Sequence, residues 1–146
     1  MHSDHSPIDA ALGDLDGYLV DADGTDSTQR YLSGFDAPDP FVTCYTPEGV
    51  YLLVSGLEYG RAKRTTDAAA VARLSAYDYR DRVDELGRTD ARATVVADFL
   101  ADHGVDGVAV PERFPLGTAD GLREAGVAVH VDDDAVTRAR AVKTPT

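Results

Sequence analysis

The chain has 146 residues, of which 26 are acidic and 14 basic, giving a net charge of −12. This field repels nucleic acid and anionic lipid, which argues against a role on either. The length fits one domain, the apolar runs are too short to cross a bilayer, and the N-terminus lacks the pattern of a signal peptide. We therefore expect a cytoplasmic location.

The composition is rich in aspartate and contains only two lysines, Lys63 and Lys143. Short carboxylates keep a protein soluble at high salt, and their mutual repulsion needs salt to screen it. This composition is typical of proteins from halophiles, and we expect a halophilic origin.

The first forty residues are predicted to hold one helix and one strand. Residues 1–7 are expected to form a flexible tail. Apolar residues at helical spacing predict a helix from Ile8 to Leu15, and Tyr18 to Val20 is predicted to be a short strand. Two prolines then predict a loop from Asp36 to Pro40.

A hairpin is predicted next. Two runs rich in β-branched and aromatic residues, Phe41 to Tyr45 and Val50 to Val54, are joined by Thr46-Pro-Glu-Gly49. Proline early and glycine late suit a tight turn between antiparallel strands. The single cysteine, Cys44, lies inside the first run; it cannot form an internal disulfide, and we expect it to be a small core residue.

Between residues 55 and 80 the pattern favours helix. Leu57 to Arg64 and Asp67 to Leu74 are predicted helices, with Asp67 as the cap of the second. Ala76 to Tyr79 is predicted to be a weak strand.

The second half is predicted to alternate helix and strand. A helix begins after Thr89 or Asp90, and strands are expected at Gly107 to Val110 and Val127 to Val131, on either side of a helix from Leu116 to Ala125. The inner face of the first helix is Ala91, Val95, Val96, Phe99 and Leu100. A strand, helix and strand in this order form a crossover with parallel strands. The sequence therefore predicts an α/β fold with one mixed sheet over residues 8–134.

One motif suggests enzymatic chemistry of its own. Asp21-Ala-Asp23-Gly-Thr25 follows a predicted strand and resembles the signature of haloacid-dehalogenase-like phosphatases. There the first aspartate attacks phosphorus, the second is the acid and base, and Mg²⁺ bridges the carboxylates and the phosphate. Ser55, Lys63 and Asp132-Asp133 would complete the site. Against this hypothesis, Asp26 stands where that family has an apolar residue.

A metal cluster is the second possible site. His130 is followed by Asp132, Asp133 and Asp134. Three successive side chains cannot all face one ion, because side chains alternate along a strand. We expect an acidic loop instead, with Asp134 as a helix cap, and we predict no metal ligands in this chain.

Two further segments carry a resemblance to a known family. Tyr31-Leu-Ser-Gly-Phe35 is similar to the Tyr-Leu-Thr-Gly-Phe-like segment of creatinase, prolidase and aminopeptidase P, with serine in place of threonine. Arg140-Ala-Val-Lys143 is similar to the segment that opens their catalytic domain. The chain thus resembles the N-terminal domain of these Xaa-Pro metallopeptidases, and residues 135–146 the start of the helix that links it to the catalytic domain.

The resemblance implies a ribonuclease-H-like sheet flanked by helices and no catalysis by this chain alone. Its partners would be a C-terminal pita-bread catalytic domain and a second protomer in a homodimer. Two divalent metals, Mn²⁺, Co²⁺ or Zn²⁺, would bind in the catalytic domain and hydrolyse a peptide substrate. Dipeptidase, aminopeptidase and creatinase-like activities all stay open. If the catalytic residues are degenerate, the domain would serve dimerisation alone.

The loop that follows Gly34 is the candidate site. The resemblance implies that Phe35, Asp36 and Asp39 lie near the substrate at the active-site mouth of the partner chain, where they could contact a peptide's amino end. The alternative is a surface loop whose prolines restrict its conformations.

Overall fold

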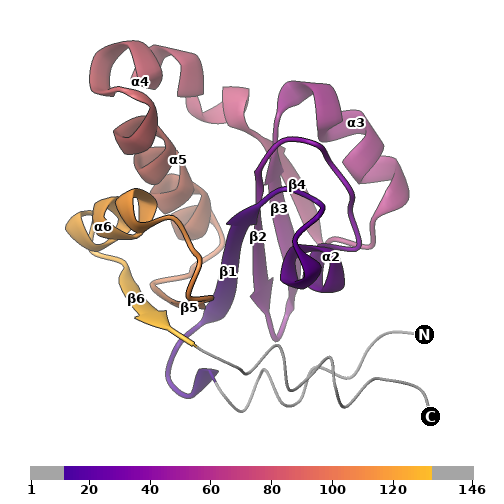
Figure 1. The fold of residues 1–146 in the computed structure, drawn as a ribbon, viewed down its shortest axis with the longest axis horizontal. Helices are drawn as coiled ribbons and strands as arrows, with labels where there is room; N and C mark the ends of the chain where they lie inside the picture. Colours follow the sequence, from indigo (N-terminus) through magenta and orange to yellow (C-terminus); the bar gives the residue numbers. More distant parts are fainter. Residues whose placement is uncertain (1–11, 133–146) are drawn as a thin grey trace.

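A computed structural model describes residues 12–132 as one mixed sheet between two layers of helices. Its strands are β1 (Gly17–Ala22), β2 (Phe41–Thr46), β3 (Gly49–Val54), β4 (Ala70–Arg73), β5 (Gly107–Val110) and β6 (Ala128–Val131). Its helices are α2 (Ser27–Ser33), α3 (Gly56–Thr65), α4 (Tyr79–Leu86), α5 (Arg88–Asp102) and α6 (Leu116–Glu124), with a 3₁₀ turn, η1 (Leu74–Tyr77). Figure 1 shows their arrangement.

The strand order is β4-β3-β2-β1-β5-β6. The pairs β1–β2 and β2–β3 are antiparallel, whereas β3–β4, β1–β5 and β5–β6 are parallel. The predicted mixed sheet, an antiparallel meander plus a parallel crossover, is therefore confirmed. All strands except β2 run in one direction, so that their carboxyl ends and the start of β2 meet at one edge of the sheet.

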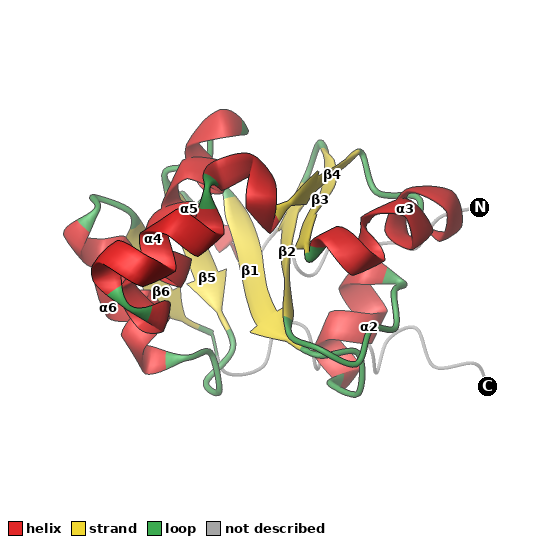
Figure 2. Cartoon of the chain, turned by 90° about the horizontal axis from the view of Figure 1, so that it is seen from above, coloured by secondary structure: helices red, strands yellow, loops and turns green. Residues whose placement is uncertain are grey.

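Helices cover both faces of the sheet. Figure 2 shows α4, α5 and α6 on one side and α2 and α3 on the other. Neighbouring residues of a strand face opposite layers, as the pleat requires: Leu19 packs with Phe99 of α5, and Val20 packs with Leu32 of α2. Near the end of β3, Leu52 and Val54 face α3.

Most of the predicted core is confirmed. The inner face of α5 is buried as expected, and the hairpin pairs in register from Val42 opposite Leu53 to Thr46 opposite Gly49. Cys44 is fully buried, and burial raises the pKa of its thiol to about 12. It is therefore a core residue and not a nucleophile.

Two predictions between residues 67 and 79 are wrong. Asp67 to Leu74 was expected to be helical, but Ala70–Arg73 is β4 and Leu74 begins η1. The alanine-rich run has high helix propensity, yet pairing with the open edge of β3 outweighs it. Ala76 to Tyr79, expected as a strand, is the end of η1 and the start of α4, whose first turn follows Asp78 in the left-handed conformation (φ 57°).

The structure also contains α2, a helix over residues for which no helix or strand was predicted. Asp26 caps it with a hydrogen bond from the backbone nitrogen of Gln29, and Gly34 ends it at φ 64°. Of the predicted helix from Ile8 to Leu15, only the last residues lie within the described range. The tail 1–7 and the linker segment 135–146 lie outside it. Within residues 12–132, no helix has the length and apolar character needed to cross a membrane.

Candidate functional site

Two acidic segments meet at the edge where the parallel strands end. One is the Asp21–Asp26 turn, which leads from β1 into α2. The other is the Phe35–Pro40 loop, which leads from α2 into β2. The backbone nitrogen of Gly24 donates to the carbonyl oxygen of Ala37 at 2.8 Å. A Cβ atom on Gly24 would lie 2.6 Å from the nitrogen of Ala37, so this close approach requires glycine.

The buried side chain of Phe35 anchors the Phe35–Pro40 loop to the core. Its side chain is 2% exposed, and its ring meets that of Phe41 edge to face with the centroids 5.4 Å apart. The guanidinium of Arg61, from α3, lies over the other side at 4.3 Å from the ring centroid. The ring is thus enclosed by its own domain, and its predicted position near a substrate stays a prediction.

Asp36 and Asp39 are the acidic residues of this loop, and both are exposed. Within residues 12–132, neither carboxylate has a hydrogen bond or an ion pair. The backbone of Asp36 is held, since its carbonyl oxygen accepts from Arg61 Nη2 at 2.7 Å. The loop therefore presents two solvated carboxylates on an anchored backbone.

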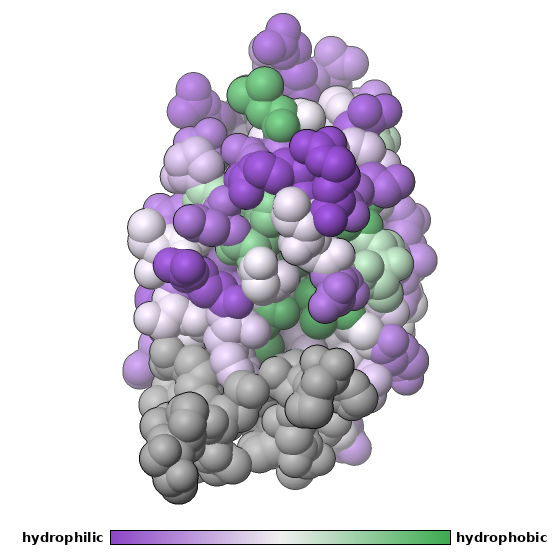
Figure 3. Space-filling view, turned by 90° about the vertical axis from the view of Figure 1, so that its right-hand side faces the viewer, coloured by the Kyte–Doolittle hydropathy of each residue, from purple (hydrophilic) through white to green (hydrophobic). Residues whose placement is uncertain are grey.

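The side of the molecule on which α2 and α3 lie is mostly hydrophilic and shows only small hydrophobic areas (Figure 3). Leu57 of α3 is an exposed apolar residue, with 94% of its surface accessible to solvent. Isolated apolar residues of this kind are common on soluble proteins.

Asp21 has a structural partner. Its side chain is only 3% exposed and accepts two hydrogen bonds from Arg92 of α5, at 2.8 and 2.7 Å. Burial alone would lower the pKa of Arg92, but the hydrogen bonds and charge of Asp21 raise it on balance. A carboxylate enclosed by a guanidinium in this way is not poised to attack phosphorus.

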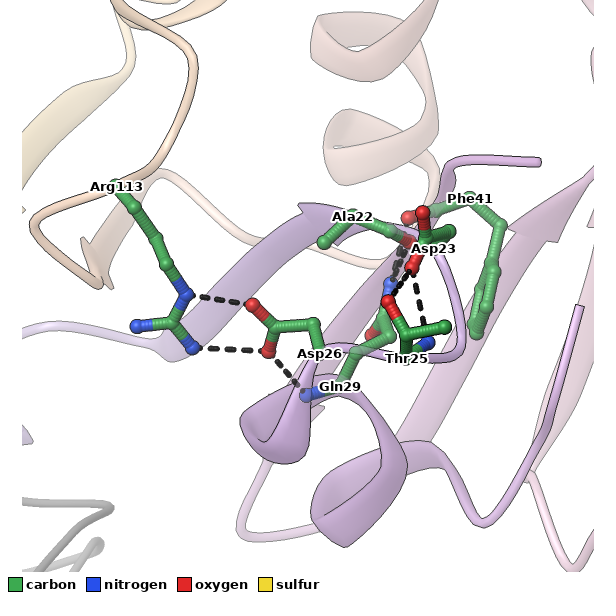
Figure 4. Close-up of polar contacts among 7 residues, drawn as sticks. All are labelled: Ala22, Asp23, Thr25, Asp26, Gln29, Phe41 and Arg113. Atoms are coloured by element: carbon green, nitrogen blue, oxygen red, sulfur yellow. Dashed lines mark hydrogen bonds and ion pairs between the residues drawn. The ribbon is translucent and has the colours of Figure 1, made fainter. Parts of the chain in front are cut away.

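The other two aspartates of the turn, Asp23 and Asp26, also have hydrogen-bond partners (Figure 4). Asp23 accepts from the backbone nitrogen of Thr25 at 2.9 Å and from its hydroxyl at 2.5 Å, and these bonds lower the pKa of Asp23. Asp26 caps α2 and accepts from Arg113 at 2.5 and 2.8 Å. The bond from Arg113 is the main reason that the pKa of Asp26 is lowered. The aspartates of this turn therefore hold β1, α2, α5 and the segment around Arg113 together. The phosphatase hypothesis is not favoured.

The remaining parts of that hypothesis do not assemble either. Ser55 is the N-cap residue of α3, and the ammonium of Lys63 lies 5.4 Å from the centroid of the Tyr59 ring. Asp132 follows β6, and its backbone nitrogen donates to the carbonyl oxygen of Val110. Asp133 and the predicted cap Asp134 lie outside the described residues. Over 12–132, no three histidine, cysteine or acidic side chains are grouped as a metal site requires.

Gln29 is the important residue that sequence reasoning missed. It is fully buried, and its Nε2 donates to the carbonyl oxygens of Ala22 at 2.8 Å and Phe41 at 2.7 Å. Its Oε1 accepts from the hydroxyl of Thr43 at 2.5 Å. One side chain thus ties α2 to the end of β1 and the start of β2. The spacing Asp26-x-x-Gln29 is typical of a helix start and could have indicated both the helix and this residue.

The comparison with models of protein families identifies the family of this chain. The model described as Creatinase/Prolidase N-terminal domain matches residues 10–142. No curated protein matches the sequence.

Several solved structures share the fold. A prolidase from Pyrococcus horikoshii OT3 is 18% identical, with TM-score 0.63, and the match covers 93% of this chain and 34% of that one. A Xaa-Pro dipeptidase from Bacillus anthracis is 14% identical, with TM-score 0.67, over 96% of this chain and 36% of that one. A proline dipeptidase structure from Streptococcus pneumoniae is 21% identical, with TM-score 0.63, and the match covers 97% of this chain and 100% of that one. At these identities the likeness shows the fold, and the chain spans about a third of the first two proteins.

Proposed function

Because the chain belongs to the creatinase/prolidase N-terminal domain family, we propose that it is the non-catalytic N-terminal domain of a Xaa-Pro dipeptidase or aminopeptidase. The observation that carries the proposal is the family match over residues 10–142, which spans the whole described sheet. The fold shared with prolidase and dipeptidase structures supports it.

The proposed partners are a C-terminal pita-bread catalytic domain and a second protomer. Two of the similar structures, a prolidase and a Xaa-Pro dipeptidase, are about three times as long as the matched part. A protein of that kind has room for a catalytic domain after this one. The two metals, Mn²⁺, Co²⁺ or Zn²⁺, would bind there and activate the water that cleaves the peptide bond.

The Phe35–Pro40 loop is proposed to shape the active-site mouth of the partner protomer. Free carboxylates on an anchored backbone suit this role, because a fixed negative charge can orient the ammonium of a peptide's amino end. Asp36 and Asp39 would make that contact, and Phe35 would hold the loop from inside.

The test uses the full-length peptidase. Asp36→Ala and Asp39→Ala should raise KM or change the preferred peptide length, while fold and metal content stay as in the wild type. Asp120→Ala is the matched control, since Asp120 is exposed on α6 on the opposite layer. A dimeric parent that cleaves Xaa-Pro peptides with unaltered kinetics in both variants would reduce the loop to a connection. A parent without such cleavage would overturn the proposed activity.

We also propose a halophilic origin. With 26 acidic and 14 basic residues, the folded chain repels itself, and salt shortens the range of that repulsion to about 3 Å at 1 M. The melting temperature should climb steadily from dilute buffer into molar KCl. A flat or falling curve would contradict the proposal.

A further inference from the structure

We infer that Arg61 is a positioning residue that fixes the backbone of the Phe35–Pro40 loop at Asp36 and so sets the direction of the Asp36 carboxylate. The effect of this direction on substrate binding rests on the proposed function. The fixing of the backbone can be tested without it.

Arg61 holds the loop with two different parts of one planar group. Its guanidinium carbon lies over the ring of Phe35, 4.3 Å from the centroid, while Nη2 donates to the carbonyl oxygen of Asp36 at 2.7 Å. A guanidinium can stack and donate at the same time because its donors lie in the plane of the group. Two successive residues of the loop are therefore held by one side chain.

The guanidinium is itself held in place. Glu58, one turn earlier in α3, accepts from Nε at 3.0 Å and from Nη2 at 2.6 Å through the same oxygen. These bonds leave Arg61 oriented toward the loop although its side chain is 41% exposed. Arg61 is less suited to bind the carboxylate of a peptide, because its Nε and Nη2 already donate hydrogen bonds to Glu58 and Asp36.

Other contacts hold the loop on either side of Asp36. The backbone nitrogen of Phe35 donates to the hydroxyl of Ser33 at 3.0 Å, and that of Gly24 to Ala37 at 2.8 Å. Arg92 reaches the carbonyl oxygen of Pro40 at 3.4 Å. Among the described residues, Arg61 alone holds the carbonyl of Asp36. Without it, the peptide unit that follows Asp36 can turn, and the direction of the Asp36 side chain turns with it.

The first experiment measures amide hydrogen exchange in this chain. Arg61→Ala should raise the exchange rates of the amides of Phe35 and Gly24, which donate to Ser33 and Ala37, by about tenfold, while the amides of α5 keep their protection. Arg61→Lys should behave much like alanine, because an ammonium keeps the charge but cannot stack and donate in the same plane. Glu58→Gln, which retains Arg61 but weakens its support, should have a smaller effect in the same direction. Unchanged exchange in Arg61→Ala would overturn the inference.

The second experiment measures kinetics in the full-length peptidase. Arg61→Ala should raise KM several-fold with little change in kcat, and the double variant Arg61→Ala/Asp36→Ala should be no worse than Asp36→Ala alone. Additive effects of the two substitutions would overturn the inference. If Asp36→Ala is silent while exchange in Arg61→Ala rises, the proposed role of the loop fails and the positioning of its backbone stands.

Discussion

Two acidic segments lie side by side at one edge of the sheet, and they differ in what their aspartates do. In the Asp21–Asp26 turn every carboxylate has a partner: Arg92, Thr25 or Arg113. In the Phe35–Pro40 loop the backbone is held, whereas neither carboxylate has a partner among residues 12–132. The carboxylates of the first segment hold secondary-structure elements together, whereas those of the second segment are exposed to solvent. The number of acidic residues does not distinguish the two; their partners do.

The largest effect on stability is expected from removing Arg92, the partner of Asp21 in the first segment. Arg92→Ala leaves Asp21 charged and almost fully buried, and should lower the free energy of unfolding by about 3–5 kcal/mol. Urea unfolding of this chain measures the loss. The control is Asp120→Ala, whose pair with Arg123 is exposed and 3.7 Å long, with an expected loss of about 0–1 kcal/mol. Similar losses in both variants would contradict the structural role of Asp21.

Gln29→Ala should have the next largest effect. It removes three hydrogen bonds and leaves the carbonyls of Ala22 and Phe41 and the hydroxyl of Thr43 without that partner, at a cost of about 3 kcal/mol. The same unfolding experiment measures it. Arg30→Ala, an exposed change on the same helix, should stay within about 0.5 kcal/mol. A comparably small loss for Gln29→Ala would show that water replaces the lost bonds.

Asp26→Ala should cost about 1–2 kcal/mol near neutral pH, through the lost helix cap and ion pair. The folded-state pKa of Asp26 lies below its usual value of 3.8, chiefly because of Arg113. The stabilisation is therefore complete above that value and is lost as the pH falls through the lower folded-state pKa. Unfolding free energies of wild type and variant should converge in strong acid. A constant difference across the whole pH range would rule out a contribution from the charge of Asp26.

The smallest effect is expected in the other segment. Asp36→Asn and Asp39→Asn should change the free energy of unfolding by no more than about 0.5 kcal/mol, with a slight gain at low salt because each removes one negative charge from a chain of net charge −12. Thermal unfolding at low and high salt measures both. A loss above about 1 kcal/mol would break the comparison, because these carboxylates would then also hold structure.

Sequence patterns predicted the fold where local and tertiary preferences agree. The hairpin and α5 have apolar residues at the spacing of their element and also face the core, so pattern and packing give the same result. The run around Ala70 favours helix locally but lies beside the open edge of β3, and pairing decided it. No pattern within the run carries that information.

For the site, the resemblance located the loop but could not show its supports. Arg92 and Asp21 are 71 residues apart, and the sequence offers many other arginines and aspartates as partners. Whether an aspartate is paired or free depends on such long-range contacts. The roles of Arg61 and Gln29 depend in the same way on which strands and loops meet at this edge.

The central position of β1 has a consequence for synthesis on the ribosome. β1 can pair with β2 as soon as Phe41–Thr46 has emerged, but its other neighbour, β5, begins only at Gly107. Until then the nascent chain carries β1 with one unpaired edge, and Asp21 has no Arg92 to pair with until α5 has been made. Contacts so distant in sequence form late, and open strand edges pair readily with other chains. The meander can therefore assemble early in translation, whereas the edge that carries both acidic segments is completed only after β5 has been made.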